Sequence, residues 1–456
     1  MSALWTATAL QEATGGRFTH PFAATGIAID TRGLTPGEMF VALQGEHRDG
    51  HEFIPAALQA GAAGALAQHG APDLPLLLVD DTLTGLTALG RAGRARFIGK
   101  LAAITGSVGK TTTKEMLRTI LAAAGPTHAA SASHNNHWGV PLTLARLPAD
   151  AAFCVAELGM NHAGEIEPLA RLARPHVAIV TAIAPAHIGH LGSIEAIADE
   201  KAAILRGLEP GGVAVLPADS AQFPRLRDAA RQAHARIVSF GAASDADFRL
   251  DAAEVNAEAI TFRAACPGAT VTLRLAAPGR HMALNALAAL AAAASLGIPP
   301  ARAAAALDGF APLAGRGARR EIAVPGGHAL LLDESYNANG ASMRAALAVL
   351  AAQPGRRIAV LGDMLELGAH AQAEHAALAE ALVPAADRVF LCGTQMRHLR
   401  DALPNPAAVA YAPDSTALAP LLVQAVRPGD AILVKGSLGS RMNIVVAALA
   451  RLAEGG

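Results

Sequence analysis

The chain has 456 residues and a mass of 46.3 kDa. A single domain usually has about 100 to 200 residues, so we expect two to three domains. The 37 lysines and arginines nearly balance the 38 aspartates and glutamates, which excludes the strongly basic surface typical of nucleic-acid binding. A hydrophobic fraction of 52% and a charged fraction of 16% exclude a disordered chain.

The N-terminus and the apolar stretches predict neither a secreted nor a membrane protein. Residues 1–16 lack a basic segment followed by an apolar run. The most apolar stretch, residues 283–298, is shorter than the roughly 20 residues that span a bilayer, and it predicts a buried helix. The three cysteines lie more than a hundred residues apart without a CxxC pair, which favours a reducing cytoplasm. We expect a cytoplasmic monomer with no nucleic-acid partner and no membrane span.

The first 81 residues predict a small mixed domain. Their apolar runs are short, and turn signals occur at residues 35–37 and 48–50. Residues 82–97 have the composition of a connecting helix.

From residue 82 to residue 312 the pattern predicts a domain built on a parallel sheet. Short apolar runs alternate with helix-length segments, which is typical of strands joined by crossover helices. The predicted strands cover residues 101–105, 153–158, 177–182 and 213–216.

A second α/β unit follows a break rich in proline and glycine at residues 310–315. Its predicted strands cover residues 329–333, 358–362, 388–392 and 431–435, and its predicted helices include residues 370–382 and 440–453. The predicted fold class is therefore α/β with three domains. These are a small mixed N-terminal domain (1–81), a central phosphate-loop ATPase-type domain (82–312) and a C-terminal Rossmann-like domain (313–456).

A glycine-rich loop lies between the predicted strand 101–105 and a helical run. The loop consists of Gly106, Ser107, Val108, Gly109, Lys110, Thr111 and Thr112. Its backbone N–H groups can point at phosphate oxygens, and the following helix adds its positive end. In this pattern Lys110 reaches the β and γ phosphates and the Thr111 hydroxyl binds Mg²⁺. Ile104 replaces the first glycine of the usual GxxxxGK[ST] pattern; the alternative is a glycine-rich turn with a solvated lysine.

A phosphate loop alone does not separate kinases, switch GTPases, motors and ligases. The sequence lacks the Asn-Lys-x-Asp motif expected of a GTPase and the Gly-rich loop and His-Arg-Asp set of a protein kinase. A different phosphate-loop switch or kinase, and a catalytically silent binding protein, stay open at this point.

Three further polar residues are candidates for the site. Glu157 ends the predicted strand 153–158, at the edge where α/β sheets bind ligands, and its carboxylate suits Mg²⁺, although it could equally cap a helix. His187 follows the next strand, and a lone histidine is more often structural than a ligand. Lys201 lies in a helical run, where nothing local distinguishes it from a solvated surface lysine.

The sequence resembles the Mur ligase family over nearly its whole length. Besides the phosphate loop, the similar segments include residues 30–32, 36–43, 49–51, 135–136, 139–143, 279–281, 285–287, 315–316, 335–339, 362–368 and 435–437. Residues 336–339 (Tyr-Asn-Ala-Asn) and 362–368 (GDMLELG) are similar to the family member that adds a dipeptide. The Asp-Asn-Pro run of the member that adds diaminopimelate or lysine is absent.

The resemblance implies a role for each matching position. The implied substrate-binding residues are Thr31, at the uridine nucleotide, with Asn136, Asn337 and Asn339. The implied ATP-binding residues are Gly106, Ser107, Val108, Gly109, Lys110, Thr111, Thr112, Asn285, Arg316 and Asp333. The implied metal ligands are Thr111, Glu157, His187 and Lys201, and the implied catalytic residues are Lys110, Lys201, His187 and Arg316. Lys201 matches the family lysine that CO₂ converts into a carbamate near a second Mg²⁺.

The resemblance also implies the reaction. We expect an ATP-dependent ligase that adds D-alanyl-D-alanine to UDP-N-acetylmuramoyl-tripeptide through an acyl phosphate during peptidoglycan precursor synthesis, with ATP and two Mg²⁺ ions. The alternative within the same class is another Mur-type ligase, or a folylpolyglutamate synthase, with a different acceptor.

Overall fold

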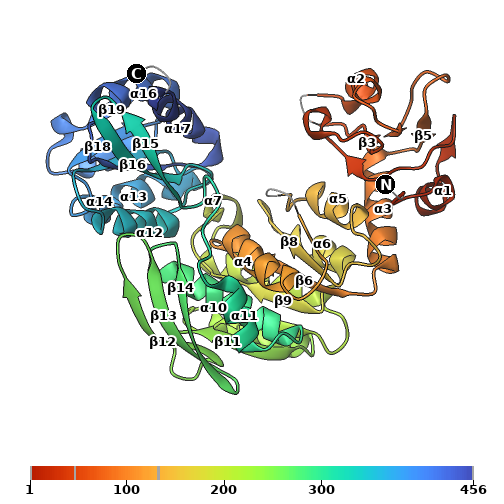
Figure 1. Ribbon diagram of the computed structural model, residues 1–456, viewed down its shortest axis with the longest axis horizontal. Helices are drawn as coiled ribbons and strands as arrows, with labels where there is room; N and C mark the ends of the chain where they lie inside the picture. The colour runs from red at the N-terminus through yellow and green to blue at the C-terminus, as the bar shows by residue number, and fades with distance from the viewer. Residues whose placement is uncertain (1–2, 46–47, 131–133, 454–456) are drawn as a thin grey trace.

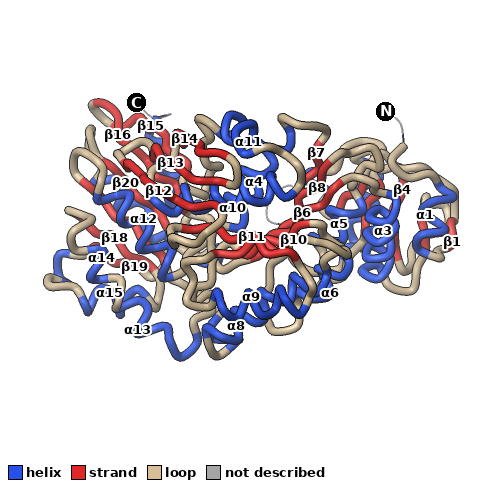
Figure 2. Tube along the Cα trace, turned by 90° about the horizontal axis from the view of Figure 1, so that it is seen from below, coloured by secondary structure: helices blue, strands red, loops and turns tan. Residues whose placement is uncertain are grey.

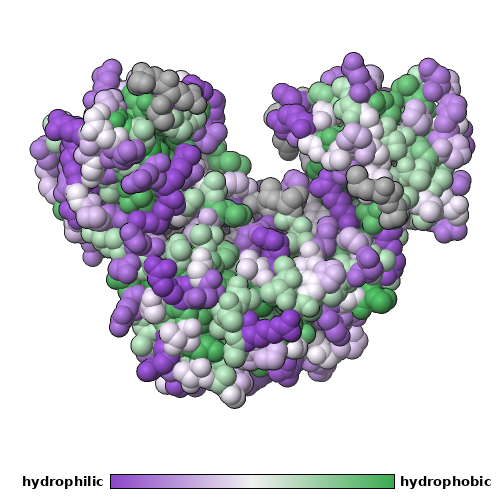
Figure 3. All heavy atoms as spheres, in the orientation of Figure 1, coloured by the Kyte–Doolittle hydropathy of each residue, from purple (hydrophilic) through white to green (hydrophobic). Residues whose placement is uncertain are grey.

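The computed structural model describes residues 3–45, 48–130 and 134–453, which form three β-sheets. Each sheet comes from a different stretch of the chain, namely residues 17–78, 100–275 and 318–435. The lobes that carry the first and third sheets rise from the two ends of the central lobe, so that the molecule has the shape of a U (Figure 1). The space-filling view shows an open gap between these outer lobes (Figure 3).

The N-terminal lobe contains a mixed sheet with the strand order β1-β5-β4-β3-β2. The pair β1–β5 is antiparallel and the other pairs are parallel. Its elements are α1 (Ala7–Thr14), β1 (Arg17–Phe18), β2 (Ile27–Ala28), η1 (Thr31–Gly33), β3 (Met39–Val41), η2 (Gly50–Phe53), α2 (Ile54–Gln59), β4 (Gly64–Ala67) and β5 (Leu76–Leu78). The predicted connecting helix is confirmed as α3 (Thr82–Arg96), and Asp81 caps it by accepting a hydrogen bond from the Thr84 N–H at 2.6 Å.

The central sheet has the strand order β14-β13-β12-β11-β10-β9-β6-β8-β7. The four predicted strands are observed as β6 (Lys100–Thr105), β8 (Phe153–Glu157), β9 (Val177–Val180) and β10 (Val213–Pro217). The sheet is parallel from β7 to β12, which confirms the predicted α/β class. Strands β12, β13 and β14 form an antiparallel extension that was not predicted.

The remaining elements of this lobe connect and cover the sheet. They are α4 (Lys110–Ala122), β7 (Thr127–Ala129), α5 (Gly139–Ala145), α6 (Ile166–Ala173), α7 (Ile188–Leu191), α8 (Ile194–Ala202), η3 (Ala203–Gly207), α9 (Phe223–Gln232), β11 (Arg236–Gly241), β12 (Phe248–Val255), β13 (Ile260–Cys266), β14 (Ala269–Leu275), α10 (Arg280–Ser295) and α11 (Pro300–Leu307). Helices α4, α10 and α11 lie on one side of the strands, and α6, α8 and α9 lie on the other (Figure 2).

Helix α10 confirms the buried helix predicted for residues 283–298. Most of its side chains pack inside the core between the sheet and α4. Among the described residues, no helix combines the length and apolarity that crossing a membrane requires.

The C-terminal sheet has the order β15-β16-β20-β17-β18-β19, with β15–β16 antiparallel and the other pairs parallel. The predicted strands are observed as β16 (Gly327–Glu334), β17 (Arg357–Gly362), β18 (Arg388–Cys392) and β20 (Ala431–Lys435). The other elements are β15 (Ala318–Val324), α12 (Gly340–Ala351), η4 (Gly368–His370), α13 (Ala371–Ala376), α14 (Ala379–Leu382), α15 (Met396–Ala402), η5 (Pro406–Ala408), β19 (Ala410–Ala412), α16 (Ser415–Ala425), η6 (Leu438–Ser440), α17 (Asn443–Ala450) and η7 (Arg451–Ala453).

Two predicted helices of this lobe differ from the structure. The helix predicted at residues 370–382 divides into α13 and α14, because the Leu378 N–H bonds to the His375 carbonyl, which tightens the turn to i→i+3. The helix predicted at residues 440–453 begins only at Asn443, because Arg441 has a φ of +53°, which cannot continue a right-handed helix.

Candidate active site

The glycine-rich loop connects the end of β6 to the first turn of α4, which confirms the predicted strand–loop–helix arrangement. Gly106 and Gly109 have φ values of +145° and +84°, a region that favours glycine. No side chain caps the N-terminus of α4. Its first N–H groups and the positive end of the helix therefore form a site suited to an anion.

The segment after β9 forms hydrogen bonds with this loop. Ser107 Oγ donates to the Ala184 carbonyl at 2.8 Å and accepts from the Ala184 N–H at 3.0 Å. Thr181 Oγ1 donates to the Val108 carbonyl at 2.6 Å. A Cβ on Gly106 would lie only 2.0 Å from Thr181 Oγ1, so the loop and this segment fit closely.

Gly109 lies against Asn285 of α10, where a side chain has no room. A Cβ at Gly109 would lie 2.4 Å from Asn285 Oδ1, and the positive φ adds strain for any other residue. We expect Gly109→Ala to lower the free energy of unfolding by about 1–3 kcal/mol. We also expect about tenfold weaker ATP binding, which corresponds to about 1.4 kcal/mol. Thermal denaturation and calorimetry with a non-hydrolysable ATP analogue measure the two effects.

Gly211→Ala is the matched control for this prediction. Gly211 has a similar φ of +75°, but a Cβ there would have nothing within 4 Å. It therefore carries the backbone strain without the clash, and ATP binding should be unchanged. Equal loss of ATP binding in both variants would contradict a specific role for the contact between Gly109 and Asn285.

Lys110, Thr111 and Glu157 meet beneath the loop. Lys110 Nζ donates to the Gly106 carbonyl at 2.6 Å, and Thr111 Oγ1 donates to Glu157 Oε2 at 2.9 Å. Glu157 ends β8 and is only 1% exposed. Burial lowers the pKa of the Lys110 ammonium; Glu157 opposes this shift and Arg316 adds to it. The predicted charged residues therefore lie close enough to influence one another.

Lys201, near the end of α8, is buried and is not the solvated surface residue that its local sequence suggests. It is 2% exposed. Burial lowers the pKa of its amine well below the usual value, the Lys110 ammonium lowers it further, and Glu200 opposes both. Within residues 3–45, 48–130 and 134–453, no side chain or carbonyl forms a hydrogen bond or ion pair with Lys201 Nζ. Burial and the neighbouring ammonium therefore both favour the uncharged form of the Lys201 amine.

A cavity of about 620 Å³ lies between the central and C-terminal lobes. Among the predicted site residues, the cavity is lined by Ser107, Val108, Gly109, Lys110, Thr112, Asn285, Arg316, Asn337 and Asn339. The predicted residues outside this lining are Thr31, Gly106, Thr111, Asn136, Glu157, His187, Lys201 and Asp333. The cavity lies within the size range of sites for ligands as large as nucleotides.

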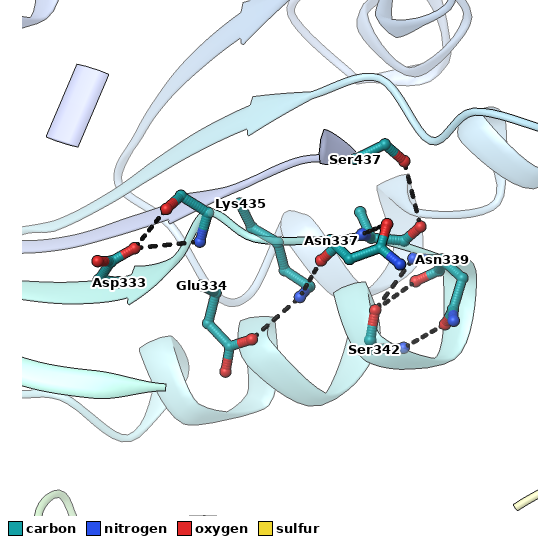
Figure 4. A network of polar contacts seen from close by, with 9 residues as sticks. Asp333, Glu334, Asn337, Asn339, Ser342, Lys435 and Ser437 are labelled. Carbon is teal, nitrogen blue, oxygen red and sulfur yellow. Dashed lines mark hydrogen bonds and ion pairs between the residues drawn. The ribbon is translucent and has the colours of Figure 1, made fainter. Parts of the chain in front are cut away.

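The C-terminal wall of the cavity is held by polar contacts at the ends of β16 and β20 (Figure 4). Buried Lys435 donates from Nζ to Glu334 Oε2 and to the Asn337 carbonyl, both at 3.0 Å. Asn339 caps α12 by accepting a hydrogen bond from the Ser342 N–H at 3.0 Å. These contacts fix the loop after β16 at the edge of the cavity.

Arg316 and Asp333 differ in their access to the cavity. The Arg316 guanidinium lies over the Tyr336 ring, 3.9 Å from its centroid, and lines the cavity. Asp333 is buried, and its Oδ1 accepts hydrogen bonds from Ser335 Oγ at 2.6 Å and from the Ser335 N–H at 3.1 Å. The Asp333 carboxylate thus orders its own loop.

Three other predicted residues lie on separate elements. His187 precedes α7, and its Nδ1 contacts Glu366 Oε2 of the C-terminal lobe. Thr31 begins η1 in the N-terminal lobe. Asn136 Oδ1 accepts from the Gly139 N–H at 3.0 Å, at the start of α5. The structure therefore distributes the predicted substrate contacts over all three lobes.

Three polar residues at the site were not assigned a role from the sequence. Asn135 Nδ2 donates to Glu157 Oε1 at 2.8 Å. Lys114 is fully buried, and its Nζ lies 4.0 Å from Glu157 Oε2. Lys435 lines the cavity. The sequence could have indicated two of these residues. Lys114 lies one helical turn after the loop lysine, and Lys435 ends a predicted strand.

Asp49, His51 and His69 of the N-terminal lobe also place potential metal-ligand atoms within 4.8 Å of one another. His51 Nδ1 lies 2.6 Å from Asp49 Oδ1, and the Gln68 N–H donates to His51 Nε2 at 2.9 Å. Because Nε2 accepts a hydrogen bond, Nδ1 carries the ring proton. A metal at Nδ1 would move that proton to Nε2 and break the bond to Gln68, so the group suits a structural link between loops.

Three family profiles match consecutive parts of the chain. They are the Mur ligase family, catalytic domain, at residues 23–78, the Mur ligase middle domain at residues 104–293, and the Mur ligase, glutamate ligase domain, at residues 300–438. The chain therefore belongs to the Mur ligase family, which confirms the resemblance found in its sequence.

Individual relatives are similar over all three lobes. The chain is 38% identical over 428 residues to UDP-N-acetylmuramoyl-tripeptide–D-alanyl-D-alanine ligase of Escherichia coli strain K12, covering 93% of each chain. The crystal structure of MurF from Acinetobacter baumannii has a TM-score of 0.86 at 32% identity, covering 98% of this chain and 99% of that chain. MurF ligase from Thermotoga maritima in complex with ADP has a TM-score of 0.78 at 25% identity, with 94% and 98% covered.

Proposed function

We propose that this chain is an ATP-dependent ligase that joins D-alanyl-D-alanine to UDP-N-acetylmuramoyl-tripeptide in peptidoglycan precursor synthesis. One observation carries the proposal. The phosphate loop of the central lobe faces the polar strand ends of the C-terminal lobe across one cavity, in a chain that is similar along its whole length to dipeptide-adding ligases. Such a cavity brings ATP and an acceptor amine from different lobes to one carboxylate.

The chemistry requires activation, because a carboxylate is a poor electrophile. The carboxylate oxygen of the tripeptide attacks the γ-phosphorus of ATP, and ADP leaves, which gives an acyl phosphate. The free amine of D-alanyl-D-alanine then attacks the carbonyl carbon, the amine loses a proton, and phosphate leaves with the electrons of its C–O bond. Lys110 and Arg316 offset the repulsion between carboxylate and triphosphate, so that catalysis consists of positioning and electrostatic stabilisation.

The donors beneath the loop fit Mg²⁺. Glu157 offers a buried carboxylate and Thr111 a hydroxyl, and oxygen ligands are those that Mg²⁺ prefers. In our proposal Thr111 and Glu157 hold one ion, and His187 and Lys201 contribute to a second site. Mg²⁺ held by these residues would supply positive charge against the phosphates and the transferring phosphoryl group.

We further propose that Lys201 carries a carbamate. Its uncharged amine nitrogen forms a bond to the carbon of CO₂ and releases one proton, so that a neutral side chain becomes an anionic oxygen donor. Only the uncharged amine has the lone pair that this step needs. The burial that lowers the Lys201 pKa, and the lack of a hydrogen-bond partner within the described residues, support this reaction.

The substrates are assigned to the outer lobes and the cavity. Thr31 contacts the uridine nucleotide, and Asn136, Asn337 and Asn339 contact the peptide substrates. Asn285 and Asp333 serve the adenine and ribose regions of ATP. Closing the gap between the outer lobes would exclude water, which otherwise hydrolyses the acyl phosphate (Figure 3). We propose domains 1–81, 82–312 and 313–456 as the moving units of a cytoplasmic monomer.

Acceptor dependence tests this function. ADP release is expected to require both UDP-N-acetylmuramoyl-tripeptide and D-alanyl-D-alanine, with single amino acids inactive in place of the dipeptide. Oxygen-18 in the tripeptide carboxylate should appear in the released phosphate, and hydroxylamine should trap a hydroxamate. Turnover with a single amino acid alone would indicate another Mur-type acceptor. ATP hydrolysis that ignores both substrates would indicate a phosphate-loop hydrolase instead.

A further inference from the structure

The central and C-terminal lobes touch at a small joint between α7 and η4. The Gly189 N–H donates to the Glu366 carbonyl at 3.2 Å, and a Cβ on Gly189 would lie 2.7 Å from the Gly368 nitrogen. Ile188 packs against the core of the C-terminal lobe. Backbone meets backbone here without room for a side chain between them, so the joint holds the two lobes in a defined register.

His187 and Glu366 face one another across this joint. The contact joins His187 Nδ1 to Glu366 Oε2. Both residues have left-handed backbones, with φ values of +60° and +64°. This conformation costs a non-glycine residue about 1 kcal/mol or more, and such strain is concentrated at functional sites. Both partners of this contact therefore adopt an unfavourable backbone conformation, and the rest of the fold must stabilise the contact.

The contact also determines which ring nitrogen of His187 faces the C-terminal lobe. Nδ1 of His187 faces the Glu366 carboxylate. Nε2 therefore lies on the far side of the ring from Glu366, with its lone pair available whenever the ring proton is on Nδ1. Within the described chain, no residue forms a hydrogen bond or ion pair with His187 Nε2. A charged carboxylate behind a histidine is the usual support of a metal-binding imidazole.

The segment that carries His187 is fixed at its other end by the phosphate loop. Ala184, three residues before His187, exchanges two hydrogen bonds with Ser107. The ring therefore lies between two anchors, one in the ATP-binding loop and one in the C-terminal lobe.

We propose that Glu366 is a positioning residue for the metal site: from the C-terminal lobe it holds the His187 ring with Nδ1 toward its own carboxylate, so that Nε2 is presented to a divalent cation. Cation affinity then depends on whether the C-terminal lobe is seated against α7. The inference rests on the proposed function, because it concerns the ions that this function uses. By linkage, a bound cation stabilises the joint by the same free energy that the joint adds to cation binding.

Binding of Mn²⁺ to the full-length chain with ADP, followed by the electron paramagnetic resonance signal of free Mn²⁺, tests the proposal. Glu366→Gln keeps the shape and an acceptor but loses the charge, and Glu366→Ala loses both. We expect about tenfold weaker Mn²⁺ binding for Gln and a larger loss for Ala, within the range of about 10- to 100-fold for support residues of metal ligands. Affinity for ADP without metal should be unchanged. Glu380→Ala, which removes an exposed carboxylate of the same lobe, is the matched control.

The possible results distinguish a positioning role of Glu366 from a structural one. Unchanged Mn²⁺ affinity in Glu366→Gln would overturn the proposal, and so would tighter binding, because it would make Glu366 a competitor of the cation for His187. Weaker ADP binding without metal would show a general structural role instead. If Glu366→Ala does not fold, Glu366→Gln alone supplies the answer. Failure of the unmodified chain to bind Mn²⁺ at all would instead count against the proposed function.

Discussion

Replacing Lys110 with alanine is expected to lower kcat/KM for ATP about a thousandfold, or about 4 kcal/mol of transition-state stabilisation. The ammonium lies at the first turn of α4, next to the loop carbonyl that it now contacts, and it lines the cavity. With ATP bound, it is the cation placed to offset charge on the transferring phosphoryl group. Steady-state ADP release in the presence of both substrates measures the effect.

The fold should survive this change, because the buried face of α4 is formed by other side chains such as Met116, Leu117 and Ile120. Lys100→Ala removes an exposed lysine at the opposite end of β6 and should leave turnover unchanged. Lys110→Arg keeps the charge, but a planar guanidinium does not fit a position built for a compact ammonium, so at least about tenfold impairment is expected there too. Near-normal turnover of Lys110→Ala would be incompatible with the assigned site.

The parallel strands were predictable because each is buried on both faces. β6, β8 and β9 are continuous apolar runs, which distinguishes them from amphipathic segments. The antiparallel strands β13 and β14 carried a weaker signal of alternating residues. Phe262 is buried, Arg263 is exposed and Ala264 is buried again. This period of two is typical of a sheet with one face exposed to solvent. The alternation is short and interrupted, so it did not stand out in the sequence.

Some residues of the site could be predicted from their local sequence, and others only from how distant parts of the chain pack together. The phosphate loop and the strand-end position of Glu157 follow from neighbouring residues, and the structure has both. The burial of Lys201 does not, because it depends on how α8 packs within the folded lobe. The pairing of His187 with Glu366 depends on two lobes meeting. His187 was a candidate because it follows a predicted strand, whereas the segment of Glu366 was noted only through the family resemblance.

Lys201→Ala is expected to lower kcat by about a hundredfold, which corresponds to about 2.7 kcal/mol, because it removes the anionic metal ligand that the proposed carbamate would provide. Millimolar formate or acetate should restore part of the activity by occupying the space of the missing carbamate, whereas chloride at equal ionic strength should not. In the unmodified chain, carbon-13 bicarbonate should produce a carbamate resonance that the variant lacks. Removing CO₂ should lower activity, and adding bicarbonate should restore it.

Two further variants separate a carbamate from other roles of the same side chain. Lys201→Met fills the space with an apolar chain. Because the buried amine that it replaces forms no hydrogen bond within the described residues, the variant should fold stably. It should nevertheless be inactive, and carboxylates should not restore its activity. Lys201→Arg keeps a cation that cannot react with CO₂ and should be as impaired as Lys201→Ala. If Lys201→Arg were active, the side chain would act as a cation. If Lys201→Met were active, the Lys201 side chain would serve only to pack α8 against the rest of the lobe.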